Sequence, residues 1–551
     1  MPTLDISKKD LEKMVGKKFS MTGLEEVLEY VKGEVDGVDG DTVKVDCKET
    51  NRPDLWSTEG IARDLKARMG IQKGIVKYKV EKSNVEIIVD KNLDKLRPAI
   101  AGAVVKGITI DEPLLLQMIQ IQEKVCETFG RKRKEAAMGI YDFDIMKAPI
   151  YYKGFKDNEI EFVPLEWKVP MRPTEILSQH DKGKKYAHLL ADTNVFPILI
   201  DSNNLVASMP PIINSNATGK VTEKTKNLFV EVTGFNQAIV EVALEVILMA
   251  LADRGGKIYS CKINFPKTRK IKSTITPKFN TKKISFDKEQ ILTKTGLALK
   301  DNEIKSLLER ARYNVKITGK KIDLEYSSYR KDIFHAVDVI EDLLISYGYN
   351  NIVPEKIEMD VKGSQRKEVL FYDLVREGCV GLGLQEVQTF NLTSLEIQST
   401  KMNLENEKDS FVQLANPVSI NYEIMRKRLT PQLLSFLSKN KSQEFPQNIF
   451  EIGTCLDIDE SCENGVKQTM NLCGMLSSSN VEFTQIKSVL VSLCDYLGLE
   501  VKVKKSAFSF LSENSAELTI NGKKGFIGEL SKEVESNFSL KKPVVLFEFE
   551  L

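Results

Sequence analysis

The sequence contains few of the residues that build zinc sites, disulfide frameworks and histidine-dependent catalytic centres. Among 551 residues there are three histidines and eight cysteines, and no two cysteines form a Cys-x-x-Cys pair. Zinc sites and disulfide frameworks use closely spaced Cys or His residues. We therefore expect a reduced, cytosolic protein whose thiols are small core residues.

The sequence also lacks an excess of charge of either sign. Lys and Arg together number 79, Asp and Glu number 78, and the net charge is +1. Bulk charge therefore gives no general attraction for nucleic acid, and any contact with RNA must come from a local patch. One such candidate is the basic run at residues 131–134, for which a solvated loop is an equal alternative.

Long hydrophobic runs are missing as well. The most apolar helical stretch, residues 238–252, is interrupted by Glu241 and Glu245, and a membrane-spanning helix needs about 20 apolar residues. The first four residues, Met-Pro-Thr-Leu, lack the basic and apolar regions of a signal peptide. We expect a cytoplasmic protein that does not enter a membrane.

The chain is too long for a single hydrophobic core. Its composition, 42% hydrophobic and 28% charged, is that of an ordinary globular protein, and its length predicts about three to five domains. Sequence patterns divide it into residues 1–75, 76–268, 269–352 and 355–551. Mixed helical and strand patterns predict an α+β multidomain fold.

The first two regions begin with short, clear signals. Residues 51–55, Asn-Arg-Pro-Asp-Leu, predict a turn, and the following helix has Ile61, Leu65 and Met69 at i+4 spacing and ends at Gly70. We interpret this turn as structural in an N-terminal α/β domain. The second region begins with strands at residues 85–89 and 100–105 and a helix at residues 114–129.

The third region, residues 269–352, has the pattern of a small winged-helix-like module. A hairpin is predicted where residues 315–317 and 322–324 alternate on either side of Gly319. A helix precedes it, with Asp301 as the expected N-cap and apolar residues at helical spacing, namely Ile304, Leu307, Leu308 and Ala311.

An acidic helix follows the hairpin. Asp338, Glu341 and Asp342 have i, i+3, i+4 spacing and therefore share one face. We expect the carboxylates to point outward while an apolar face packs on the core. The apolar face is formed by Val337, Ile340, Leu343, Leu344 and Tyr347.

Carboxylates at this spacing repel one another, so the cluster favours a bound cation. Oxygen ligands suit a hard ion such as Mg(II), which takes few carboxylates and keeps several waters. Asp332 lies just before the helix, where it could cap the helix or join the ion site. From spacing alone, the alternative is a solvated acidic surface.

The wider string from Tyr329 to Ile352 resembles the metal-site segment of the beta subunit of phenylalanyl-tRNA synthetase. The shared motifs are Arg-x-Asp-Ile, Asp-x-x-Glu-(Asp/Glu) and Tyr-Gly-Tyr-(Asn/Asp)-Asn-Ile, in this order and spacing. In that family four acids bind magnesium at the contact with the catalytic alpha subunit. The resemblance places these ligands at Asp332, Asp338, Glu341 and Asp342. Here Ser328 and Tyr329 stand where the family more often has Pro-Thr or Pro-Ser.

Segments of residues 76–268 resemble the editing domain in the archaeal and eukaryotic form of the same family. The resemblance implies a pocket that hydrolyses mischarged tRNA, lined by Leu199, Ser208, Glu231 and Thr233. Archaeal members tend to have Asp at the position of Glu231. The family's Gly-x-His-Asp motif has Tyr141 in place of His, and we assign no catalytic role to Tyr141.

The residues of this region favour attack by water over a covalent mechanism. A Phe-shaped synthetic site cannot strongly reject an analogue that merely adds a hydroxyl, so correction of mischarged Tyr-tRNA makes chemical sense. The region contains no Ser-His-Asp or Cys-His set. His180 and His188 lie on a polar stretch and are expected at the surface. Direct hydrolysis of the ester by water is therefore the expected chemistry.

The last region resembles the class II synthetase-like domain of the beta subunit. A helix is predicted at residues 369–379, and strands are predicted at 448–452, 470–476 and 544–549. Class II active sites bind ATP through Phe-Arg-x-Glu and Gly-x-Gly-x-x-Arg motifs, and the sequence contains neither of them. We expect an antiparallel sheet domain that is catalytically silent.

The resemblance covers nearly the whole chain and implies a beta subunit of the archaeal or eukaryotic cytosolic type. Such a subunit works in an α2β2 heterotetramer, attaches Phe to tRNA(Phe) using ATP together with the alpha subunit, and hydrolyses Tyr-tRNA(Phe). Bacterial beta subunits are longer. The alternatives are a free-standing hydrolase of mischarged tRNA and a non-enzymatic RNA-binding scaffold, and the near-neutral charge disfavours the scaffold.

Overall fold

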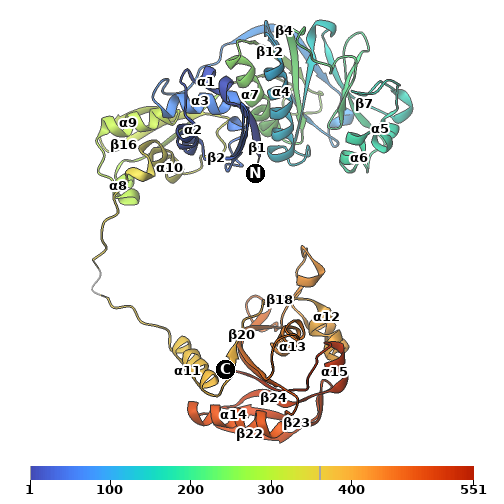
Figure 1. Ribbon diagram of the computed structural model, residues 1–551. Helices are drawn as coiled ribbons and strands as arrows, with labels where there is room; N and C mark the ends of the chain where they lie inside the picture. Colours follow the sequence, from blue (N-terminus) through green and yellow to red (C-terminus); the bar gives the residue numbers. More distant parts are fainter. Residues whose placement is uncertain (1, 359–360) are drawn as a thin grey trace. The chain divides into compact units, whose positions relative to one another are not determined.

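The computed structural model describes residues 2–358 and 361–551 (Figure 1). The chain forms two compact units, Met1–Glu355 and Lys356–Leu551. Both combine helices with β-sheets, so the expected mixed α/β multidomain architecture is confirmed. Within the described residues, no helix is long and apolar enough to cross a bilayer.

A small sheet and three helices begin the first unit. The sheet has the strand order β1-β3-β2. Each helix starts at a serine whose hydroxyl accepts a backbone N–H bond, which satisfies one of the free donors at the helix start. The elements are β1 (Thr3–Ser7), α1 (Lys8–Val15), α2 (Met21–Leu28), β2 (Gly33–Asp39), β3 (Thr42–Cys47) and α3 (Thr58–Arg68).

The predicted turn before α3 is a buried structural element. The Arg52 guanidinium donates two hydrogen bonds to the Asp54 carboxylate, at 2.9 and 2.8 Å. A Cβ atom at Gly60 would lie 1.9 Å from the Asp54 carbonyl oxygen, so only glycine allows α3 to pack this closely on the turn.

A large sheet forms the centre of the first unit. Its strand order is β10-β9-β8-β7-β4-β12-β5-β11-β6, and β13 pairs with β12. The strands are β4 (Val80–Val89), β5 (Ala99–Lys106), β6 (Ala136–Asp142), β7 (Ile150–Phe155), β8 (Phe196–Ile200), β9 (Val206–Met209), β10 (Ile213–Asn214), β11 (Asn227–Gly234), β12 (Lys257–Asn264) and β13 (Ser273–Thr276).

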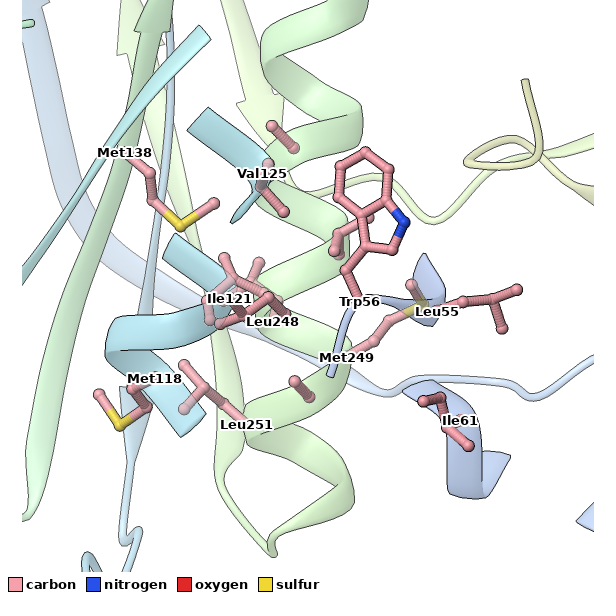
Figure 2. Packing of buried hydrophobic residues seen from close by; sticks show 14 of the residues in the cluster. Leu55, Trp56, Ile61, Met118, Ile121, Val125, Met138, Leu248, Met249 and Leu251 are labelled. Atoms are coloured by element: carbon pink, nitrogen blue, oxygen red, sulfur yellow. The ribbon is translucent and has the colours of Figure 1, made fainter. Parts of the chain in front are cut away.

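Helices α4 (Glu112–Lys124) and α7 (Gln237–Asp253) join this sheet to the N-terminal elements in one hydrophobic core. Figure 2 shows Leu55 and Trp56 beside α7, with Met118 and Ile121 of α4 in the same cluster. The predicted helix at residues 114–129 is present, and its last turn is a π-helix, Val125–Phe129. Two short helices, α5 (Pro173–Gln179) and α6 (Asp181–Tyr186), precede β8.

The two ends of the large sheet meet. Strand β6 ends one side of the strand order and β9 and β10 end the other, yet the Asp142 N–H donates to the Thr218 carbonyl at 2.9 Å. The Tyr141 hydroxyl on β6 lies 2.8 Å from Ser208 Oγ on β9. The sheet therefore curls until its two edges are joined by hydrogen bonds, and we call this junction the seam.

The third sheet of the first unit has the strand order β14-β16-β15. The predicted hairpin is confirmed as β15 and β16, and the acidic helix is α10. The helix before the hairpin, α9, begins at Asp301, but its N-cap is Lys300 and the Glu303 side chain makes the capping bond, so our assignment of Asp301 as N-cap is wrong. The elements are β14 (Thr281–Asp287), α8 (Glu289–Thr295), α9 (Asp301–Arg310), β15 (Asn314–Thr318), β16 (Lys321–Ser327) and α10 (Ala336–Tyr347).

The second unit is built on one mainly antiparallel sheet with the order β17-β20-β21-β25-β24-β23-β22. The predicted helix and the three predicted strands are confirmed as α11, β20, β21 and β25. The elements are α11 (Lys367–Gly381), β17 (Gln385–Glu386), β18 (Leu392–Thr393), α12 (Leu395–Gln398), β19 (Ile424–Met425), α13 (Thr430–Lys439), β20 (Gln447–Ile458), β21 (Val466–Ser477), α14 (Phe483–Leu497), β22 (Val501–Lys505), β23 (Leu511–Ile520), β24 (Lys523–Leu530), α15 (Lys532–Asn537) and β25 (Val544–Glu550).

Candidate functional site: a seam pocket and an acidic cavity

A cavity of about 380 Å³ lies at the seam of the large sheet. Its walls come from α4, β6 and the segment after β9. Apolar side chains form one part of the lining and could hold a ring, while the polar part includes the cations Arg133, Lys182 and Lys220. The lining includes Met118, Met138, Ile140, Pro211 and Ile212 together with Gln122, Ser208 and Glu231.

Glu231 is the buried acid of this seam pocket. It lies on β11 and is flanked in register by Gly102 of β5 and Gly139 of β6. Only 2% of its surface is exposed. Burial raises the pKa of Glu231 to about 8, although the bond to Tyr141 and the Arg97 charge oppose the rise. Its Oε1 atom is bonded to Tyr141, while Oε2 is buried with no partner among the described residues.

Tyr141, to which the sequence analysis assigned no catalytic role, is bonded to two residues that line the pocket. Its hydroxyl lies 2.9 Å from Glu231 Oε1 and 2.8 Å from Ser208 Oγ, so it bridges three strands across the seam. A Cβ atom at Gly139 would lie 2.0 Å from this hydroxyl and 2.7 Å from Glu231 Oε1. Gly139 and Tyr141 share a face of one strand, and this i, i+2 relation was a signal present in the sequence.

Ser208 and Glu231 line the seam pocket, but Leu199 and Thr233 do not. Leu199 pairs with Ser208 between β8 and β9, and its side chain is fully buried in the apolar core on the inner face of the sheet. The Thr233 hydroxyl accepts a 2.9 Å hydrogen bond from Arg97 Nε. The structure thus brings two of the four expected residues to the cavity and places the other two behind its walls.

Arg97 fastens the basic turn to the end of β11. Its guanidinium is buried and donates to the carbonyls of Thr233, Arg133 and Lys134 at 2.6, 3.1 and 3.0 Å. In the turn, Arg131, Lys132 and Arg133 have left-handed φ angles of 48°, 53° and 66°. Such angles strain residues other than glycine and persist where surrounding contacts impose them.

Arg133 connects this turn to the segment that lines the seam pocket. Its guanidinium donates to the carbonyls of Pro211 and Ile212, at 3.1 and 2.7 Å, and lies 4.2 Å from the centre of the Tyr186 ring. Arg131 and Lys132 are exposed beside it. The basic run is therefore held in place through Arg133, and its other two cations in this turn are exposed.

The two histidines near this pocket have no catalytic geometry. We expected both at the surface. His188 is exposed, but His180 is 4% exposed, and that expectation is wrong for it. Both ring nitrogens of His180 have hydrogen-bond partners, the Leu165 carbonyl and the Lys182 N–H, and these bonds allow the ring to be buried.

The four acids of the expected metal site line one polar cavity of about 300 Å³. They come from α10 and the segment before it, and Lys32, Glu49, Arg52 and Arg68 of the N-terminal elements complete the lining. The acids are Asp332, Asp338, Glu341 and Asp342. We call this the acidic cavity.

The expectation that all the carboxylates of α10 point outward is wrong for Asp342. Asp342 is 5% exposed and accepts hydrogen bonds from Arg68, Arg330 and Tyr313 at 2.6, 2.7 and 2.8 Å. Burial alone would raise the pKa of Asp342, but the Arg330 and Arg68 guanidinium groups hold it well below its usual range. The expected apolar face differs too, because Val337 is 48% exposed.

The other three acids have different partners. The Asp332 carboxylate accepts a 2.9 Å hydrogen bond from Arg330 Nε. One oxygen of Asp338 accepts the backbone N–H groups of Phe334 and His335, both at 2.7 Å, so Asp338 caps the helix in place of Asp332. Glu341 Oε1 lies 2.8 Å from the Lys32 ammonium, and the glutamate side chain is 52% exposed.

This arrangement only partly matches the ligand set of a divalent ion. Among the residues that the structure describes, no group of three or more His, Cys, Asp or Glu side chains is placed to hold a metal ion. Asp332 and Asp342 are already neutralised by arginine. Asp338 and Glu341 each use one carboxylate oxygen, and this fits a hydrated ion such as Mg(II), which is commonly held by one or two carboxylates.

The sheet of the second unit carries a buried ion pair. Arg426 Nη1 lies 2.6 Å from Glu451 Oε1, and both side chains are buried. A Cβ atom at Gly453 would lie 2.2 Å from Arg426 Nη2, so Gly453 gives this guanidinium its space. The Glu548 carboxylate accepts the N–H groups of Leu429 and Thr430, both at 2.9 Å. Arg426 and Glu451 thus neutralise each other, and Glu548 is held by neutral donors.

Two segments match known protein families. Residues 352–551 match the family described as the phenylalanyl tRNA synthetase beta chain CLM domain, and residues 284–349 match the tRNA synthetase B5 domain. A crystal structure of an N-terminal fragment of the phenylalanyl-tRNA synthetase beta-subunit from Pyrococcus horikoshii aligns with a TM-score of 0.61 and 47% identity. It covers 63% of this chain and 100% of the fragment.

Whole-length relatives agree with these matches. The phenylalanine–tRNA ligase beta subunit of Pyrococcus horikoshii is 44% identical over 557 residues, which cover 100% of this chain and 99% of the relative. That of Methanocaldococcus jannaschii is 37% identical over 557 residues, with 100% of both chains covered. Identity of this extent over the entire length shows that the chain belongs to the family of phenylalanine–tRNA ligase beta subunits.

Proposed function

We propose that this chain combines with an alpha subunit into a cytoplasmic α2β2 phenylalanine–tRNA ligase, which attaches Phe to tRNA(Phe) using ATP. The observation that carries the proposal is the 44% identity over the whole length of a named beta subunit. The adenylate-forming site is assigned to the alpha subunit, because the second unit lacks the ATP-binding arginine motifs.

Co-expression with a candidate alpha subunit tests this proposal. We expect the two chains to co-purify and to charge tRNA(Phe) with Phe, while this chain alone exchanges no pyrophosphate with Phe and ATP. Exchange by the isolated chain, or purification of active enzyme without an alpha subunit, would contradict the proposal.

We further propose that the seam pocket hydrolyses Tyr-tRNA(Phe). The pocket offers an apolar space for an aromatic ring and one buried carboxyl group, Glu231, with an oxygen that lacks a partner. A phenolic hydroxyl would satisfy that oxygen. A phenylalanyl ring would leave it buried without a hydrogen bond, and this asymmetry favours Tyr over Phe.

The ester would be attacked by water. His180 is committed to structural contacts, and burial raises the pKa of the Cys126 thiol to about 11. Neither group is a suitable nucleophile or base. Ser208 is proposed to supply a hydrogen bond in the pocket, Thr233 to hold Arg97 at the end of β11, and Leu199 to act as a packing residue behind the wall.

The double variant Glu231→Ala with Thr233→Ala tests the editing proposal in the assembled enzyme. We expect hydrolysis of Tyr-tRNA(Phe) to fall while phenylalanylation is retained. Hydrolysis at the normal rate would remove these residues from the reaction. Hydrolysis by this chain without an alpha subunit would favour the alternative of a free-standing hydrolase.

For the acidic cavity we propose a structural Mg(II) that supports the contact with the alpha subunit. Asp338 and Glu341 are the carboxylates that would hold it, and Asp332 and Asp342, each paired with arginine, line the same cavity. Replacing Asp338 and Glu341 with Ala should weaken the complex between the subunits and lower its metal content. An unchanged complex with unchanged metal content would contradict the proposal.

A further inference from the structure

The buried carboxyl group of the seam pocket is held by a residue on the neighbouring strand. Glu231 presents two carboxyl oxygens, of which Oε1 is bonded to Tyr141 and Oε2 is without a partner among the described residues. A carboxyl group that is free to rotate about its Cγ–Cδ bond would exchange the positions of Oε1 and Oε2. The bond from Tyr141 removes that freedom.

The Tyr141 hydroxyl is itself held in place. Ser208 Oγ lies 2.8 Å from it on strand β9, and the Tyr141 ring stacks on Phe229 with 5.9 Å between the ring centres. A hydroxyl group offers one donor and two acceptor lone pairs. Tyr141 can therefore donate to Glu231 and accept from Ser208 at the same time, which gives a chain of three polar groups across the seam.

We propose that Tyr141 is the positioning residue of the editing site. Its hydroxyl, anchored by Ser208, fixes Oε1 of Glu231 so that Oε2 faces the hydroxyl of a misattached tyrosine. The inference rests on the proposed editing function. It adds that discrimination between Tyr and Phe depends on a residue that need not touch the substrate.

Two further observations support this assignment. Gly139 is the position whose side chain would collide with both the Tyr141 hydroxyl and Glu231 Oε1, so the strand leaves space for their hydrogen bond. Burial also raises the pKa of Tyr141 well above its usual value, so the phenol keeps its proton and remains a donor across the working pH range.

Tyr141→Phe removes one oxygen atom and keeps the ring, so it tests the positioning role with little change in packing. In the assembled enzyme we expect kcat/KM for hydrolysis of Tyr-tRNA(Phe) to fall about ten-fold or more, since hydrogen bonds to charged or buried groups have effects of this size. The ratio of Tyr-tRNA to Phe-tRNA hydrolysis should fall as well, because a loosely held carboxyl group can turn both oxygens away from the substrate.

Tyr78→Phe is the matched control. It also removes a phenol bonded to a carboxylate, Asp253 Oδ1 at 3.1 Å, but Tyr78 lies outside the seam pocket. This variant should hydrolyse Tyr-tRNA(Phe) like the wild type. Ser208→Ala removes the anchor of the Tyr141 hydroxyl and should lower the Tyr-to-Phe ratio in the same direction as Tyr141→Phe.

The outcomes separate this inference from the function on which it rests. If the wild-type assembly hydrolyses no Tyr-tRNA(Phe), the editing function itself fails. If the wild type hydrolyses it and Tyr141→Phe keeps both the rate and the Tyr-to-Phe ratio, only the positioning role fails. A faster Tyr141→Phe enzyme would also overturn the inference, because the Tyr141 hydroxyl would then compete with the substrate for Glu231.

Discussion

Asp342→Asn should be the most destabilising single polar change in the acidic cavity. The carboxylate is 5% exposed and is bonded to two guanidinium groups and one phenol. The amide that replaces the carboxylate carries no charge. Arg68 and Arg330 would therefore lose an ion-pair partner in a buried site. Breaking a buried ion pair by removing one partner costs about 3–5 kcal/mol.

Urea unfolding followed by tryptophan fluorescence measures this cost in the unit that contains it. Both tryptophans of the chain, Trp56 and Trp167, lie in the unit Met1–Glu355. Glu341→Gln provides a matched control on the same helix. Its carboxylate is 52% exposed and bonded to Lys32, and an exposed pair of this kind contributes about 0–1 kcal/mol.

The pH dependence gives a second test. The pKa of Asp342 is lowered in the folded chain, so its stabilising effect is present above the unfolded pKa of about 4 and is lost as the pH falls toward the folded value. The difference between wild type and Asp342→Asn should therefore be constant from pH 5 to 8 and shrink below about pH 4. A loss below 1 kcal/mol at pH 7, or the same loss at pH 3, would refute the reasoning.

Four further predictions follow from the two cavities. Glu231→Gln should make stability less dependent on pH. The pKa of Glu231 is raised to about 8 in the folded chain, so the wild type should lose stability as the pH rises from about 4.5 to 8. Urea unfolding of the wild type and the variant across this range measures the difference. Gly139→Ala should lower stability by about 1–3 kcal/mol through overpacking and reduce hydrolysis of Tyr-tRNA(Phe). Gly37→Ala, where the nearest atom lies 3.9 Å from the added Cβ, should not reduce hydrolysis. Lys32→Met should increase the affinity for Mg(II), measured by calorimetry, because it removes the ammonium that competes for Glu341. Arg97→Met should free the basic turn, and faster amide hydrogen exchange at residues 131–134 would report it.

The sequence predicted the regular elements well where periodicity is local. The acidic helix, the hairpin at residues 314–327 and the strands of the second unit lie where alternation and helical spacing placed them. Local signals failed for Asp342. Its three partners lie 274, 12 and 29 residues away along the chain, so no helical pattern could reveal that a charged residue belongs to the buried face.

The arrangement of residues around the seam pocket also depends on contacts between distant segments. Ser208 and Glu231 line the pocket. Thr233 shares the face of Glu231 on β11 but is bonded to Arg97, and Leu199 lies in the apolar core. Alternation along β11 turns Leu228, Val230 and Val232 toward the helices, and Phe229 and Glu231 toward the other face. Tyr141 reaches Glu231 from the neighbouring strand, but it meets Ser208 only because the two edges of the sheet come together, and closure of this kind is not encoded in any single strand.

The seam and the acidic cavity share one physical principle. Each places a carboxyl group where burial should disfavour its charge, and neighbours from distant segments decide the result. At Asp342 two guanidinium groups overcome burial, so the carboxylate stays ionised and becomes a structural anchor. At Glu231 a phenol is the bonded partner and Arg97 acts only through its charge, so burial prevails and the group is poised near neutral pH. Glu231 has no ion pair among the described residues and is weakly ionised, and its Oε2 has no hydrogen-bond partner there. It is therefore the one of these two carboxyl groups that a substrate hydroxyl can still engage.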